Sequence, residues 1–110
     1  MHYEGTGRSV PSDLYMSNSI ERWHIVFKGE VQFVGFRYTS KIIAKELGLT
    51  GFVRNLDDGS VEAEIQGRPS LNRKFLLKLK SQPHIRILGY TVDLIEPLEN
   101  ESRFSVKQPY

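Results

Sequence analysis

The chain has 110 residues, of which 39% are hydrophobic and 25% charged, a composition typical of one globular domain, and its lack of cysteine excludes disulfides, thiolate nucleophiles and thiol-ligated metal sites. The 15 basic and 13 acidic residues leave a net charge of +2, which is too small an excess to indicate a nucleic-acid-binding surface. Because no apolar run approaches the roughly 18 residues that span a membrane and no hydrophobic leader opens the chain, we expect a cytoplasmic protein.

Residues 1–20 differ from the rest of the chain, because they are polar, rich in glycine and serine, and lack the periodicity of a helix or strand. Met16 could serve as an initiator, so residues 1–15 are interpreted as an extended start or an added leader. We therefore predict two parts, a flexible N-terminal extension over 1–20 and one domain over 21–110.

The first regular pattern is an alternation of Trp23, Ile25 and Phe27, which predicts one face of a strand. Gly29 ends this strand, and residues 30–35 connect it to a helix over 36–47. The apolar stripe of that helix has helical spacing and consists of Phe36, Ser40, Ile43 and Leu47, widened by Ile42 and Ala44. Gly48 is suited to end the helix.

Two short strands are predicted next, over 51–56 and 60–66. They flank Asp57, Asp58 and Gly59, and Asp-Gly between alternating apolar runs is a strong hairpin signal. Turn chemistry explains this pair of acids better than a cation site does.

A second helix begins at Pro69 and is stopped by Pro83. Its apolar stripe consists of Leu71, Phe75, Leu76 and Leu79. A long strand over 85–96 follows, with Tyr90, Val92 and Leu94 on one face. A brief strand over 103–107 comes last, with Phe104 and Val106 expected to point inward.

This order of elements is that of the ferredoxin-like βαββαβ sandwich, with a short C-terminal strand added. We therefore predict an α+β fold in which two helices pack on one face of an antiparallel sheet. The opposite face carries Glu62, Glu64 and Gln66. RNA-recognition domains of the same topology present aromatic residues there, so the acidic face argues against RNA binding.

The segment from Gly29 to Arg37 is the most informative for chemistry. Motifs of metalloproteases, redox centres, dinucleotide folds and P-loops are absent, and the three histidines are scattered. Backbone N–H groups at the start of a helix form a natural anion site, and the Arg37 guanidinium would complete a phosphate cradle there. The pattern alone leaves open an exposed arginine at a helix end.

Two motifs resemble the signatures of the acylphosphatase family, at their usual separation and with the same order of elements. They are Gly29-x-Val31-Gln32-x-Val34-x-Phe36-Arg37 and Gly51-Phe52-Val53-x-Asn55-x-x-Asp58-Gly59-x-Val61-Glu62. The resemblance covers roughly Arg22 to Val106.

The resemblance implies an enzyme, an acylphosphatase that hydrolyses acyl phosphates, which are carboxyl-phosphate anhydrides, to a carboxylate and inorganic phosphate. Arg37 and the amides of the 30–36 loop would hold the phosphate, and Asn55 would hold the attacking water. The implied phosphate-binding residues are Val31, Gln32, Phe33, Val34, Gly35 and Phe36. The family uses no metal or organic cofactor. The implied partners are a small-molecule acyl phosphate and inorganic phosphate as product and inhibitor, with no nucleic acid or membrane, and we expect a monomer.

One position departs from the family pattern, because Phe33 stands where the family has glycine. Glycine is favoured in such loops since it tolerates positive φ and close approach to a ligand. A phenylalanine would strain the loop, narrow its mouth, or point outward if φ stays negative. We expect activity that is weakened or shifted in substrate preference, and the alternative is a phosphate-binding or acidic-metabolite-binding domain with little or no turnover.

Overall fold

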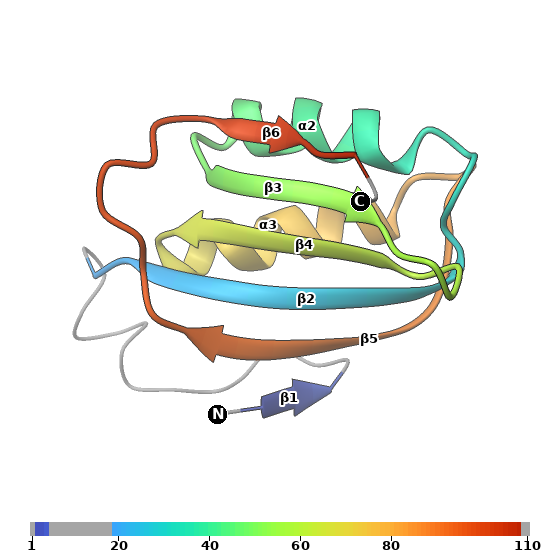
Figure 1. The fold of residues 1–110 in the computed structure, drawn as a ribbon, viewed down its shortest axis with the longest axis horizontal. Helices are drawn as coiled ribbons and strands as arrows, with labels where there is room; N and C mark the ends of the chain where they lie inside the picture. Colours follow the sequence, from blue (N-terminus) through green and yellow to red (C-terminus); the bar gives the residue numbers. More distant parts are fainter. Residues whose placement is uncertain (1, 5–18, 109–110) are drawn as a thin grey trace.

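The computed structural model describes residues 2–4 and 19–108, where a six-stranded sheet carries both helices on one face (Figure 1). The elements in chain order are β1 (His2–Glu4), β2 (Glu21–Glu30), α2 (Phe36–Glu46), β3 (Thr50–Asn55), β4 (Val61–Gly67), α3 (Pro69–Lys80), β5 (Arg86–Ile95) and β6 (Phe104–Val106). The predicted ferredoxin-like βαββαβ order over 21–106 is confirmed. No helix in these two described stretches is long and apolar enough to cross a membrane.

The strands lie in the order β1-β5-β2-β4-β3-β6. All neighbouring strands are antiparallel except β3 and β6, which are parallel, so the sheet is mixed rather than wholly antiparallel. The additional strand β1 pairs with β5 at the edge opposite β6. Residues 5–18, which hold most of the predicted flexible extension, lie outside the described residues.

The core lies between the helices and the inner face of the sheet, as the alternating patterns predict. Trp23, Ile25 and Phe27 of β2 are buried, and each is paired in register with a buried residue of β4. Phe75, Leu76 and Leu79 of α3 are buried against this layer, as are four of the positions predicted on α2 and Phe104 of β6.

Two residues that were predicted to face the core are exposed instead. Ile42 is 43% exposed, because it lies at the margin of the α2 stripe whose buried positions are Phe36, Ser40, Ile43 and Ala44. Val106 is 41% exposed, because it is the last residue of the edge strand β6 and lines an open cavity.

The open face of the sheet is occupied by ion pairs. Arg22 is 1% exposed, and its guanidinium donates to Glu64 at 2.7 Å and to Glu101 at 2.7 and 3.2 Å. Glu62 accepts from Arg54 at 2.6 Å and lies 2.7 Å from the His24 imidazole. Burial by itself would raise the pKa of Glu101, but its hydrogen bonds with Arg22 and Thr50 outweigh burial and lower that pKa below its ordinary value. These carboxylates therefore already have cationic or imidazole partners within the fold.

The β3–β4 hairpin turns as predicted. Asp58 accepts hydrogen bonds from both the backbone amide and the hydroxyl of Ser60, and these bonds lower the pKa of its carboxyl. The acid at this position is therefore a turn residue that stabilises the hairpin itself.

Candidate active site

The loop over 31–35 joins β2 to α2 and is anchored to the core at both ends. Val31 is fully buried, and Phe36 is buried with its ring 5.0 Å from that of Phe27, measured between centroids. Val34 packs partly against the same core. Because these three apolar side chains point inward, the backbone between them is held in place with its polar groups toward solvent.

Two residues of this loop adopt the left-handed conformation, Phe33 with φ +63° and Gly35 with φ +78°. For a phenylalanine this conformation costs roughly 1–2 kcal/mol, whereas glycine adopts it freely. The Phe33 side chain is 96% exposed. The ring therefore points outward although φ is positive, so the backbone keeps the shape that the family's glycine favours, and the strain remains.

The N-terminus of α2 is open to an anion. Gly35 caps the helix without a side-chain hydrogen bond, and the first turn holds no acidic residue. Within the described chain, no backbone hydrogen bond is donated by the amides of residues 32–35. Arg37 lies in the first turn, half-buried, and makes no ion pair with any described residue. Free N–H groups, the positive end of the helix dipole and a guanidinium thus meet at one place.

The Gln32 side chain braces the loop by hydrogen bonds to the β3–β4 turn. Its amide nitrogen donates to the carbonyl oxygen of Leu56 at 2.7 Å and to that of Ser60 at 2.8 Å. These acceptors lie at the two ends of the β3–β4 turn. The two hydrogen bonds therefore set the distance between the loop and Asn55, which immediately precedes Leu56.

Asn55 is the last residue of β3 and is buried on the helix side of the sheet. Its side-chain oxygen Oδ1 is buried and has no hydrogen-bond partner in the described chain. Leaving such an acceptor unpaired costs about 1–3 kcal/mol, so the site favours a donor such as water at this position.

A cavity of about 420 Å³ brings the loop, Arg37 and Asn55 together. It is lined by Val31, Phe33, Gly35, Phe36, Arg37, Tyr38, Lys41, Asn55, Val106 and Gln108. Of the predicted site residues, only Gln32 and Val34 do not line it. No lining residue is acidic, and two carry positive charge, so the cavity suits an anion.

The prediction omitted four of these lining residues. Lys41 is one helical turn beyond Arg37, and that spacing could have indicated it. Tyr38 is exposed beside Arg37, whereas Val106 and Gln108 come from the far end of the chain, and no local pattern links them to the loop.

Comparison with known proteins identifies relatives over most of the chain. The family model for acylphosphatase matches residues 23–106. An acylphosphatase of Lactobacillus johnsonii is 45% identical over 71% of this chain and 88% of its own length, and one of Ligilactobacillus salivarius is 38% identical over 79% and 98%. The crystal structure of acylphosphatase from Bacillus subtilis superposes with a TM-score of 0.74 at 33% identity, covering 79% of this chain and 98% of that one.

Proposed function

Because the chain belongs to the acylphosphatase family and hydrolyses acyl phosphates to a carboxylate and inorganic phosphate, we propose that the reaction takes place in the cavity between Arg37 and Asn55. The observation that carries this proposal is that Oδ1 of Asn55 and the guanidinium of Arg37, neither with a partner among residues 2–4 and 19–108, share one cavity with a helix N-terminus that has no side-chain cap. The cavity thus offers places for both reactants.

The phosphate would bind to the loop amides and to Arg37. Several N–H donors and a guanidinium match the oxygens of a phosphoryl group, and a guanidinium keeps its charge at any physiological pH. Because phosphoryl transfer passes through a loose transition state, fixing these donors in advance supplies most of the stabilisation that a protein can give. The buried anchors Val31 and Phe36 support this preorganisation.

Asn55 would hold the attacking water through Oδ1. The water oxygen attacks phosphorus, the bond from phosphorus to the acyl oxygen breaks, and the carboxylate leaves with the electron pair. The pKa of the leaving carboxylic acid is near ~4, like that of a free Asp or Glu side chain, so no general acid is needed. The water proton passes to a phosphate oxygen of the substrate, which removes the need for a protein base.

Isotope labelling tests this route. We expect hydrolysis of benzoyl phosphate in oxygen-labelled water to place the label in phosphate and none in benzoate, with inorganic phosphate acting as a competitive inhibitor. A protein-free reaction gives the background to subtract. Label in benzoate would mean attack at the carbonyl carbon, and inhibition that is not competitive would place the phosphate elsewhere; either result contradicts the proposed site.

The same proposal gives Phe33 a part in substrate preference, because this residue lines the cavity and its exposed ring is free to contact a bound acyl group. We expect Phe33→Gly to retain activity but to raise KM for benzoyl phosphate relative to acetyl phosphate by about fivefold, since an aromatic contact contributes about 0.5–1.5 kcal/mol. Steady-state kinetics with both substrates measures the ratio.

Phe33→Asn is the matched control, because asparagine tolerates positive φ but carries no ring. The two variants should shift the KM ratio alike if the ring is responsible. An unchanged ratio in Phe33→Gly would show that the ring does not contact the acyl group.

The proposal extends to a monomer acting in the cytoplasm, with residues 21–110 as its domain. Strand β1 supports the separation of the extension from the site, because it pairs at the sheet edge opposite β6.

A further inference from the structure

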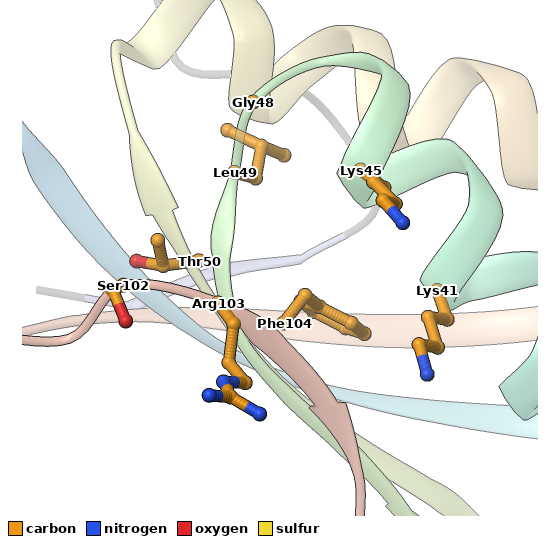
Figure 2. A pocket seen from close by; sticks show the side chains of 8 residues that line it. All are labelled: Lys41, Lys45, Gly48, Leu49, Thr50, Ser102, Arg103 and Phe104. Carbon is orange, nitrogen blue, oxygen red and sulfur yellow. The ribbon is translucent and has the colours of Figure 1, made fainter.

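A second cavity of about 420 Å³ opens between the C-terminal half of α2 and the start of β6 (Figure 2). Lys41 and Lys45 extend from α2 on one side of it, and Arg103 extends from the chain entering β6 on the other. Leu49 and Phe104, which are both buried, form its apolar floor. We call this cavity the basic cleft.

The three cations of the basic cleft have no counterion among the residues that the structure describes. Lys41, Lys45 and Arg103 are all exposed and make no ion pair with a described residue, and no acidic residue lines the cleft. Glu101, two residues before Arg103, is held by the buried Arg22 at 2.7 Å. Its charge is therefore already compensated.

Helix electrostatics accounts for only part of this arrangement. A lysine in the last turn of α2, such as Lys45, is favourable with respect to the helix dipole. Lys41 and Lys45 nevertheless repel each other at one-turn spacing, and Arg103 adds a third positive charge from a different element. A concave surface with apolar side chains and positively charged groups on two of its sides has the character of a small-molecule site.

We propose that the basic cleft binds a phosphorylated small molecule, with the phosphate among Lys41, Lys45 and Arg103 and an apolar portion against Leu49 and Phe104. This site is distinct from the cavity proposed for hydrolysis, although Lys41 lines both. Flexible lysine and arginine side chains on both sides of the cleft can donate charge-assisted hydrogen bonds to a dianion, and the floor selects a ligand with an apolar body over a bare phosphate.

Phenyl phosphate is a suitable probe because it combines a dianion with an aromatic body. Its phenolate leaving group, with a pKa near ~10, is far poorer than a carboxylate, so it survives a titration. We expect amide NMR to show saturable shifts over residues 45–50 and 102–104. Inorganic phosphate should bind in the cleft about tenfold more weakly, since it lacks the apolar portion.

The double variant Lys45→Gln/Arg103→Gln tests the site and leaves Lys41 in place, because Lys41 also lines the hydrolytic cavity. We expect phenyl phosphate to bind about tenfold more weakly at the cleft amides, while shifts over residues 31–37 keep their midpoint. Both replaced side chains are exposed, so the variant should fold with an unchanged Tm, and each single variant should show an intermediate loss.

Lys74→Gln/Lys78→Gln is the matched control, because it removes the same charge from exposed positions on α3. It should change binding at the cleft by less than about twofold. The proposal is overturned if the wild-type shifts are confined to residues 31–37 and 55, if none saturates, or if the control weakens binding as much as the cleft variant. This readout does not depend on hydrolytic activity.

Discussion

Replacing Arg37 with alanine is expected to lower kcat/KM for benzoyl phosphate by about a thousandfold. The substitution removes a bidentate donor and the one cation in the first turn of α2, where loop amides and the helix dipole already favour an anion. The other cation of the cavity, Lys41, is exposed and lies one turn further along the helix, so it does not replace Arg37. Steady-state kinetics measures the loss.

Arg37→Lys is the informative comparison. It keeps the charge but loses the planar pair of donors, so we expect activity between that of the wild type and that of Arg37→Ala. Stability should change little, because Arg37 makes no ion pair within the described chain. If Arg37→Ala retained kcat/KM within about tenfold of the wild type, the loop amides alone would hold the phosphate, and the role proposed for Arg37 would be wrong.

Replacing Asn55 with alanine is expected to lower kcat by about a hundredfold while KM for the acyl phosphate changes little. The reason is that Oδ1 would hold the water rather than the phosphate, so its loss affects the transition state more than substrate binding. Because Oδ1 is buried and has no partner in the described part of the chain, the substitution breaks no hydrogen bond seen at that atom, and we expect little loss of stability.

Asn72 provides a matched control. It is also a buried asparagine with an unpartnered Oδ1, but it lies in α3, and its Nδ2 donates to the carbonyl oxygens of Glu21 and Gly67 at 3.2 and 3.4 Å. Asn72→Ala should therefore lower Tm and leave kcat unchanged. Near-wild-type kcat in folded Asn55→Ala would contradict the water-holding role.

Local patterns predicted most of the fold, because they depend on near neighbours in sequence. Alternation at Trp23, Ile25 and Phe27 and the turn at Asp58 and Gly59 predicted β2 and the β3–β4 hairpin, and the structure confirms both. The predictions that failed concern residues at the edge of the core, Ile42 and Val106. Whether Val106 is covered depends on what packs over the end of β6, and that contact joins residues far apart in the chain.

The sequence by itself determined the family and the two motifs that contain Arg37 and Asn55, because these depend on the order and spacing of residues along the chain. The site roles of these residues stay predictions. The tertiary structure decided that Gln32 braces the loop through Leu56 and Ser60, and that the Phe33 ring points outward at positive φ. It also decided that a second group of cations gathers around the floor of the basic cleft. These features depend on strand register and on the packing of distant segments, which no local period encodes.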